Sequence, residues 1–288
     1  MHLPGCCREH PTSHPCRRPC PGARPLPRRV AGVRPVSRGV LVTGASRGIG
    51  RAIAYAFADR GDRVAVHYAS SRTSAEETLA SLPGAGHVLV GGDLGDPDAA
   101  ADVVAAAVSG LGGIDVLVNN AAVAPGPDNV HRIDEVSYAA WQQVWRRMVD
   151  VDVLGAANVT YGVARHLIER SAPGSIVNVG SRGAFRGEPD YPAYGAAKAA
   201  LHAFGQSMAL ALAPHGIAVA SVAPGFIGTE RQQPKLAGPS GADLLAQSPF
   251  GRVGTPEEVA AAVLYLSSPE AAWSSGAVLD LNGASYLR

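Results

Sequence analysis

The sequence predicts an α/β fold in which seven parallel strands form one doubly wound sheet with helices on both faces. Two observations lead to this prediction. From residue 39 onward, seven short apolar runs alternate with longer Ala-rich segments. The runs are continuous instead of alternating between apolar and polar residues, which is typical of strands buried on both faces. In such a sheet, ligands bind beyond the carboxyl ends of the strands.

The predicted elements follow one another without an internal boundary or repeat. The Ala-rich segments 51–61 and 97–110 are predicted to be helices that connect successive strands. The strands are predicted at residues 39–44, 62–68, 86–93, 113–120, 174–181, 216–225 and 276–283. Residues 39–288 are therefore expected to form a single domain.

Residues 1–38 differ from the rest of the chain. Eight arginines and one glutamate give this segment a charge of +7, so the total of +1 leaves −6 for the remainder. We predict a disordered N-terminal extension rich in Arg, Pro and Cys. A gene start placed too early is one alternative. Another is a zinc site formed by Cys6, His10, His14, Cys16 and Cys20.

Composition also limits the location and the partners of the protein. All four cysteines lie in residues 1–38, so the predicted domain has no disulfides and a cytoplasmic location is expected. The chain has no apolar run of about 20 residues, so we expect no membrane span. A basic tail without aromatic residues could bind nucleic acid only electrostatically, and we expect no nucleic-acid partner.

The first predicted strand leads into the stretch TGASRGIG. Gly44, Gly48 and Gly50 fall on the turn into the first helix. Glycines there let the backbone approach a pyrophosphate, and the helix start presents free N–H groups. A glycine triplet alone is a weak signal and could be only a tight turn. Its place between a first strand and an amphipathic helix favours a dinucleotide site.

The end of the second predicted strand distinguishes between the two nicotinamide cofactors. Tyr68 stands where an enzyme that prefers NAD would carry Asp or Glu to bind the ribose 2′-hydroxyl. Without that carboxylate, a 2′-phosphate is not repelled, and NADP(H) is favoured over NAD(H). His67 is interpreted as a partly buried strand residue, and Arg72 has the alternative of a solvated surface charge. The groups available for the phosphate are Arg47, Ser70, Ser71 and Arg72.

The stretch YPAYGAAKAA follows the fifth predicted strand and begins a helix. Tyr194 and Lys198 are four residues apart and share a helix face, whereas Tyr191 has no lysine at that spacing. A phenol with a pKa of about 10 is a poor acid–base catalyst at neutral pH unless a nearby cation stabilises its phenolate. Such a pair can also be surface decoration. Ser181, at the end of the fifth strand, could bring a hydroxyl to the phenol.

Together these features resemble the short-chain dehydrogenase/reductase family, in particular members similar to 3-oxoacyl-ACP reductases and glucose 1-dehydrogenases. The resemblance extends from about Gly39 to the C-terminal end and implies a single Rossmann-type domain. It is carried by TGASRGIG (43–50), GGDLGD (91–96), NNAA (119–122), PGFIGTE (224–230) and GRVGTPEEVA (251–260), together with Ser181, Tyr194 and Lys198.

The resemblance implies hydride transfer between a nicotinamide and a carbonyl or carbinol carbon, without a metal. Tyr194 would be the general acid or base, Ser181 would position the reacting oxygen, and Lys198 would hold the nicotinamide ribose and lower the pKa of Tyr194. The implied cofactor-binding residues are Gly44, Ser46, Arg47, Gly48, Ile49, Gly50, Tyr68, Ser70, Ser71, Arg72, Asp93, Leu94, Asn120, Ala121, Tyr194, Lys198, Pro224, Gly225, Ile227 and Thr229.

The chain departs from the family pattern at Asp152. The family usually has Asn there, which holds a water that relays protons to the lysine. A carboxylate could hold the same water, but it would also stabilise the Lys198 ammonium and offset its effect on Tyr194. We therefore count Asp152 among the catalytic candidates and expect activity with a shifted pH optimum. Ala122 and Ala284, where glycine is usual, are milder departures.

The substrate cleft is expected between residues 123–141 and a mobile lid at residues 230–250. Glu188, Asp190 and Tyr191 could contact a polar substrate or could form a rigid turn between prolines. Packing is the preferred interpretation of His131, Trp141 and Trp145. The sequence identifies the substrate only as a small carbonyl or alcohol. By analogy we expect a homotetramer, and the alternative function is a sensor or scaffold that binds NADP without turnover.

Overall fold

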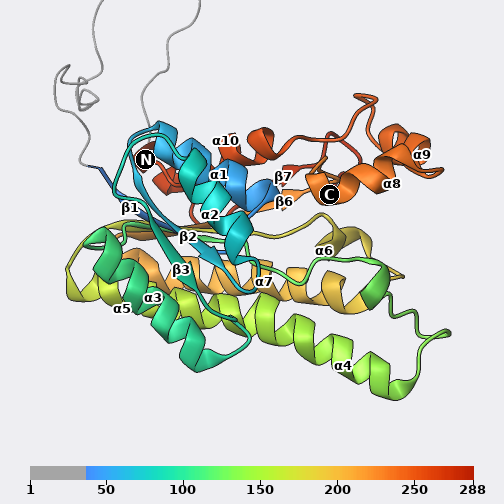
Figure 1. The fold of residues 1–288 in the computed structure, drawn as a ribbon, viewed down its shortest axis with the longest axis horizontal. Helices are drawn as coiled ribbons and strands as arrows, with labels where there is room; N and C mark the ends of the chain where they lie inside the picture. Colours follow the sequence, from blue (N-terminus) through green and yellow to red (C-terminus); the bar gives the residue numbers. More distant parts are fainter. Residues whose placement is uncertain (1–36) are drawn as a thin grey trace, which may run out of the picture. The chain divides into compact units, whose positions relative to one another are not determined.

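The computed structural model describes residues 37–288, which Figure 1 shows in colour. The predictions made for residues 1–36, including the disordered extension and the alternative zinc site, lie outside the described residues. Ser37 and Arg38 are described and precede the first strand directly.

The described residues form one sheet of seven strands, all parallel, in the order β3-β2-β1-β4-β5-β6-β7. Each strand lies inside a predicted range, so the predicted fold class is confirmed. The strand order reverses between β1 and β4, which is where a doubly wound sheet opens a crevice for a ligand. The strands are β1 Gly39–Val42, β2 Arg63–Tyr68, β3 Val88–Gly91, β4 Val116–Asn119, β5 Gly174–Val179, β6 Ile217–Pro224 and β7 Val278–Leu281.

Helices cover both faces of the sheet (Figure 1). On one face α1, α2 and α10 bury Phe57, Ala75 and Val263 against the strands. On the other face α3, α5 and α7 bury Val103, Val163 and Leu212. The α-helices are α1 Gly48–Asp59, α2 Arg72–Ser81, α3 Pro97–Leu111, α4 Tyr138–Val149, α5 Ala156–Glu169, α6 Gly183–Arg186, α7 Pro192–Leu212, α8 Gln233–Ala237, α9 Gly241–Ala246 and α10 Pro256–Leu266.

Shorter helical turns fill several connections. A π-helical turn, η2 Asp150–Gly155, joins α4 directly to α5. The 3-10 turns are η1 Pro127–Asn129, η3 Ala213–His215, η4 Glu230–Gln232 and η5 Pro269–Ser274. Turns η1 and η4 lie in the two segments predicted to line the substrate cleft, and the predicted lid at residues 230–250 contains α8 and α9.

Local sequence sets the bounds of α3. The Asp96 side chain accepts a hydrogen bond from the Asp98 N–H, and Pro97 occupies the first helical position. The helix ends at Leu111, and the C-cap residue Gly112 has a φ of 69°, which is left-handed and favours glycine. This matches the end of the apolar pattern from which the helix was predicted.

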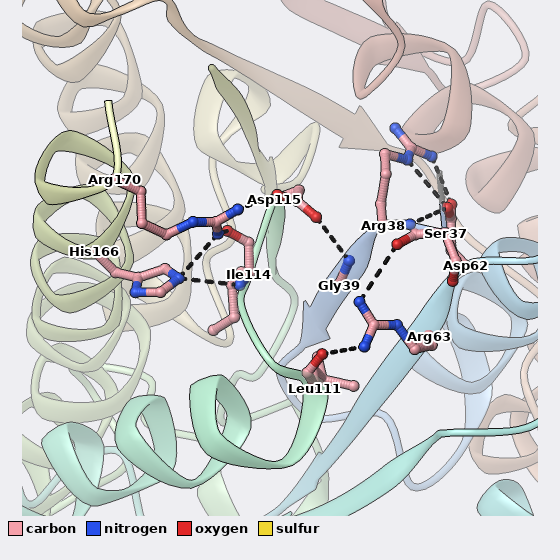
Figure 2. A network of polar contacts seen from close by, with 10 residues as sticks. All are labelled: Ser37, Arg38, Gly39, Asp62, Arg63, Leu111, Ile114, Asp115, His166 and Arg170. Atoms are coloured by element: carbon pink, nitrogen blue, oxygen red, sulfur yellow. Dashed lines mark hydrogen bonds and ion pairs between the residues drawn. The ribbon is translucent and has the colours of Figure 1, made fainter. Parts of the chain in front are cut away.

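The amino ends of the strands are joined by a polar network (Figure 2). Asp115, just before β4, accepts a hydrogen bond of 2.9 Å from the Gly39 N–H and one of 3.2 Å from Arg170. Arg38 forms a 2.6 Å ion pair with Asp62 before β2. Arg63 donates hydrogen bonds to the carbonyls of Leu111 and Ser37. This network lies at the edge of the sheet opposite the expected ligand crevice, so we assign it to stability.

Replacing Asp62 by alanine is expected to destabilise the fold by about 1–3 kcal/mol, because the Arg38 guanidinium loses the mostly buried carboxylate to which it donates. Thermal or urea unfolding measures the loss, and kcat should not change. Glu169→Ala is the control: it removes an exposed pair with Arg165 at helical spacing, worth less than about 0.5 kcal/mol. Equal stability of the two variants would contradict the assignment.

Candidate active site

The turn between β1 and α1 requires its glycines. Gly44 has a φ of 64°, and a Cβ on it would lie 2.8 Å from the Ala121 Cα. A Cβ on Gly50 would lie 2.3 Å from the Gly44 carbonyl oxygen. Any side chain would therefore displace backbone. Without side chains the backbone segments of the turn pack closely together, and the start of α1 is left available to an anionic group such as a pyrophosphate.

Two side chains from neighbouring strands hold this glycine turn. The Asn120 amide donates to the carbonyls of Thr43 and Gly44 at 2.9 and 3.0 Å. His67 Nδ1 accepts the Gly44 N–H at 2.9 Å, and its Nε2 lies 3.0 Å from the Gly92 carbonyl oxygen. Because Nδ1 accepts a hydrogen bond and Nε2 faces a carbonyl, the contacts require a neutral ring with its proton on Nε2, and burial, which lowers the pKa of His67, favours that form.

His67 is thus fully buried, not partly buried as the sequence suggested, and it orders the glycine turn. The only signal for this role in the sequence was a polar residue inside an otherwise apolar strand. Ser46 lies in the same turn and Ile49 in the first turn of α1, and the Ser46 carbonyl accepts hydrogen bonds from Arg51 and Thr78.

The residues predicted to select the cofactor gather at the end of β2. The Tyr68 ring lies over Gly91 of β3, where a Cβ would meet the ring at 2.7 Å. Arg72, the first residue of α2, is hydrogen-bonded to Tyr68 and forms a 2.8 Å ion pair with Glu76. Ser70 and Ser71 lie between them in sequence, and Arg47 is exposed on the glycine turn. The structure places no carboxylate at the Tyr68 position.

Asp93 and Leu94 follow β3. Asp93 forms a 2.9 Å ion pair with Arg147 of α4, and the hydrogen bond from this guanidinium keeps the pKa of Asp93 below its usual value. Leu94 is buried, and a Cβ on Gly155 would lie 2.7 Å from its carbonyl oxygen. The family resemblance implied that Asp93 binds the cofactor, but it did not indicate that Arg147 would hold its carboxylate.

The chain after β6 turns back over the glycine turn. The Gly225 N–H, next to Pro224, donates to the Leu281 carbonyl at 2.9 Å. Ile227 is buried and bridges to Gly254. The Thr229 methyl group lies 3.2 Å from where a Cβ on Gly48 would stand. Four of the residues predicted to hold the cofactor therefore lead from the end of β6 to the start of α1.

Ser181, Tyr194 and Lys198 come together at the carboxyl end of β5. Ser181 follows the strand and is hydrogen-bonded through its side chain to the Tyr194 hydroxyl. Lys198, one turn further along α7, donates to the Val179 carbonyl at 3.1 Å. Its Nζ lies 5.8 Å from the centroid of the Tyr194 ring. The predicted serine, phenol and ammonium thus form one cluster.

Asp152 joins this cluster from η2. It is 1% exposed, and its Oδ1 accepts a 2.7 Å hydrogen bond from the Val123 N–H. Its Oδ2 lies 3.9 Å from Lys198 Nζ and accepts no hydrogen bond within residues 37–288. π-helical turns inside α-helices occur frequently at functional sites. Here the turn aims a buried carboxylate at the buried ammonium.

Burial and nearby charges shift the pKa in the same direction for Tyr194 and in opposite directions for Lys198 and Asp152. Burial raises the pKa of Tyr194 to about 12, and the carboxylates of Asp152 and Glu188 add to the rise, whereas the hydrogen bond with Ser181 lowers it. Burial lowers the pKa of Lys198, and Asp152 raises it. Burial raises the pKa of Asp152, and Lys198 lowers it. The net pKa of Tyr194 is raised, because burial and the two carboxylates outweigh the lowering effect of the Ser181 hydrogen bond.

The segment before α7 places one more carboxylate near Tyr194. Glu188 is partly buried, and burial raises its pKa. Its closest cation is Arg186, 4.0 Å away. Asp190 pairs with Arg132 at 3.2 Å, and the Tyr191 ring lies against His131. Of the three residues proposed to contact a polar substrate, only Glu188 influences the Tyr194 phenol through its charge.

His131, Trp141 and Trp145 pack together, as expected. The ring centroids of His131 and Trp141 are 5.8 Å apart, and those of the two tryptophans are 5.6 Å apart. His131 is fully buried and also accepts a hydrogen bond from the N–H of Ala193, next to Tyr194. The sequence gave no sign of this contact.

A cavity of about 400 Å³ lies elsewhere, under the 230–250 segment. It is lined by apolar side chains such as Phe226, Leu244 and Phe250, and by the Arg182 guanidinium. Neither Ser181 nor Tyr194 lines it. We therefore place the candidate active site at the Ser181 cluster and not in this cavity.

The fold and the site define a class of protein. The doubly wound sheet has a glycine turn after β1 and, beyond β5, a cluster of a buried serine, a half-buried tyrosine and a buried lysine, and this combination suits a dinucleotide-dependent oxidoreductase. Sequence comparison narrows the class. Residues 44–283 match the family described as "Enoyl-(Acyl carrier protein) reductase". The chain belongs to the short-chain dehydrogenase/reductase family and is an oxidoreductase that acts on CH–OH or carbonyl groups.

Three proteins to which the chain is similar have different named activities. It is 38% identical to an L-rhamnose 1-dehydrogenase (NAD(P)(+)) of Sphingomonas sp., over 86% of this chain and 96% of that protein. It is 36% identical to the 3-oxoacyl-[acyl-carrier-protein] reductase FabG of Vibrio cholerae, with the same coverage of each chain. It is 33% identical to an acetoacetyl-CoA reductase of Shinella zoogloeoides, over 88% of this chain and all of that protein.

Proposed function

We propose that the protein is an NADP(H)-dependent oxidoreductase that interconverts a carbonyl group and a secondary alcohol, with Tyr194 as general acid or base. The observation that carries this proposal is the cluster of Ser181, Tyr194 and Lys198. It lies at the same edge of the sheet as the glycine turn. A hydroxyl hydrogen-bonded to the phenol, with an ammonium on the same helix face, is suited to moving a proton at an oxygen atom.

Each residue of the cluster has its own role in the proton transfer. Tyr194 gives its phenolic proton to a carbonyl oxygen in reduction, or takes the hydroxyl proton of an alcohol in oxidation. Ser181 donates to the same oxygen and holds it in line with the phenol. The Lys198 ammonium stabilises the phenolate, and Asp152 favours the protonated form of Lys198 against the larger, opposing effect of burial.

The residues of the glycine turn fit a nicotinamide dinucleotide, because Gly44 and Gly50 allow a tight backbone turn that no side chain could enter without displacing backbone, and the N-terminus of α1 that follows suits a pyrophosphate. When bound, the cofactor supplies the hydride acceptor or donor. Asn120, Ala121 and Thr229 border the same turn and would hold the cofactor, and Lys198 would reach its ribose. Asp93 and Leu94 lie at the end of β3, where they would meet the adenine.

Preference for NADP(H) rests on Tyr68 and on the arginines near it. Tyr68→Asp places a carboxylate at the end of β2, where it would repel a 2′-phosphate and accept from a free 2′-hydroxyl. We expect the ratio of kcat/KM with NADP(H) to kcat/KM with NAD(H) to fall at least about 10-fold in this variant. Initial rates with both cofactors measure the ratio. Tyr68→Phe is the control, and a ratio unchanged by aspartate would contradict the role of this position.

The function is tested by following absorbance at 340 nm with a panel of substrates. L-Rhamnose with NADP⁺ and acetoacetyl-CoA with NADPH represent the activities named for the relatives, and simple ketones and other aldoses complete the panel. Turnover that requires Tyr194 supports the proposal. NADPH binding without turnover on any substrate would favour the alternative of a sensor or scaffold protein.

We also propose a homotetramer in the cytoplasm. Large apolar side chains are exposed on helices, which supports burial against further copies of the chain: Leu154 at 51%, Tyr161 at 71%, Leu210 at 82% and Trp273 at 101%. The small residues Gly155 and Gly205 pack within the chain against Leu94 and Asn178. The location rests on the absence of cysteine from residues 39–288. Among residues 37–288, no helix combines the length and the apolar character needed to cross a bilayer.

A further inference from the structure

Residues 123–131 connect the two ends of the candidate active site through hydrogen bonds, and we call this segment the 123–131 strap. At one end the Val123 N–H donates to Asp152 Oδ1 at 2.7 Å. Within the strap, the Asn129 amide donates to the Ala124 carbonyl at 3.1 Å and accepts from the Gly126 N–H at 2.9 Å. The strap therefore has a defined shape.

The other end of the strap is His131. Its Nδ1 lies 2.8 Å from the Asn129 carbonyl oxygen, and its Nε2 accepts the Ala193 N–H at 2.9 Å. A carbonyl can only accept and an N–H can only donate, so the ring is neutral with its proton on Nδ1. The side chain is fully buried. An unbroken path of hydrogen bonds and short backbone links thus runs from Asp152 to the residue before Tyr194.

Helix α7 needs this contact because of its own sequence. It begins at Pro192, which has no N–H, and its N-cap residue Tyr191 offers no side-chain acceptor. The N–H groups of the first turn have no partner inside a helix. Those of Tyr194 and Gly195 reach the Tyr191 carbonyl. The Ala193 N–H is instead satisfied by an imidazole from a segment about 60 residues earlier.

Two further contacts hold the same pair of segments together. The His131 N–H donates to the Asp190 carbonyl at 3.0 Å, and Arg132 pairs with the Asp190 carboxylate at 3.2 Å. The Trp141 and Tyr191 rings meet the imidazole at 62° and 66°. The position of the ring is fixed on several sides, so the place of its Nε2 atom is fixed as well.

We propose that His131 is a positioning residue for Tyr194. By capping α7 at Ala193, it fixes the first turn of the helix and so holds the phenol in hydrogen-bonding reach of Ser181, while the strap ties this turn to Asp152. The inference rests on the proposed function, because it assigns His131 to the geometry of the same proton transfer. A misplacement of about 1 Å at a reacting group can lower a rate on the order of 100-fold.

The test compares His131→Leu with His131→Gln. Leucine removes the acceptor for the Ala193 N–H, whereas the glutamine carbonyl oxygen can take the place of Nε2. We expect leucine to lower kcat by about 10- to 100-fold, with NADPH affinity, measured by fluorescence, unchanged. Glutamine should recover most of kcat. Rates are measured with the panel substrate that the parent enzyme turns over fastest.

His87→Leu is the matched control. The His87 imidazole also accepts a backbone N–H, that of Val64 at 3.1 Å, and contacts the Pro83 carbonyl, but it lies before β3 at the opposite edge of the sheet. Both leucine variants should lose stability, and only His131→Leu should lose kcat. An equal kcat in the two variants would overturn the proposal, since His131 would then be merely structural.

A second readout does not depend on turnover. Hydrogen exchange of the peptide that covers residues 191–195 should be faster in His131→Leu than in the parent and slow again in His131→Gln. Unchanged exchange in His131→Leu would contradict the proposal that His131 caps the start of α7. Tyr194→Phe distinguishes a failure of the proposed function from a failure of the positioning role of His131. If Tyr194→Phe keeps full activity, the proposed function fails. If it is inactive while His131→Leu matches the parent, only the positioning role fails.

Discussion

Tyr194→Phe is expected to lower kcat by at least about 100-fold, the smallest factor typical of a lost general acid or base. The substitution removes one oxygen and leaves the ring to pack as before. Ser181 and Lys198 remain, but neither can replace the proton of the phenol, because Lys198 is bound to the Val179 carbonyl and faces Asp152. The loss should appear in both directions of the reaction.

The measurement is kcat with saturating cofactor, together with the affinity for NADPH. Affinity should change little, since the glycine turn is untouched. Tyr265→Phe, which removes a hydroxyl from an exposed tyrosine of α10, should behave like the parent. A Tyr194→Phe enzyme with at least a tenth of the parent kcat would mean that another group supplies the proton.

Asp152→Asn is expected to move the pH–rate profile to lower pH while activity survives. The Asp152 carboxylate disfavours the Tyr194 phenolate and raises its pKa. A neutral amide of the same shape removes that effect, so the pKa of Tyr194 falls and the phenolate forms at lower pH. Alcohol oxidation, which needs the phenolate, should then reach its half-maximal rate at lower pH. The rate of carbonyl reduction, which needs the phenol, falls as the pH is raised, and in the variant this fall should begin at a lower pH than in the parent.

The same substitution acts on Lys198. Asp152 raises the pKa of Lys198 against the opposing effect of burial, so the lysine also loses its proton at lower pH in Asp152→Asn. Profiles of kcat/KM are recorded in both directions for the parent and the variant. Asp150→Asn, at the first position of the same π-helical turn, controls for a change of charge nearby. Overlapping profiles of Asp152→Asn and the parent would show that the carboxylate does not tune the proton transfer.

The sequence by itself determined the fold and the chemical core of the site. Continuous apolar runs fix the strands, because a strand covered on both faces has no polar side to show. The glycine turn could be predicted because Gly44 and Gly50 occupy places where a side chain would meet backbone. Tyr194 and Lys198 were paired through the spacing of a single helix, and Ser181 through its place after a strand.

Only the tertiary structure decided how these groups are held and charged. His67 reaches Gly44 from the neighbouring strand β2, Arg147 of α4 holds Asp93, and His131 caps α7 from the strap. Such contacts join residues that are far apart in sequence, and no local period or spacing encodes them. The direction of the Tyr194 pKa also depends on the balance between burial and the charges around the phenol. That balance exists only once Asp152 and Glu188 have been brought beside α7, because desolvation and Coulomb energies depend on positions in space.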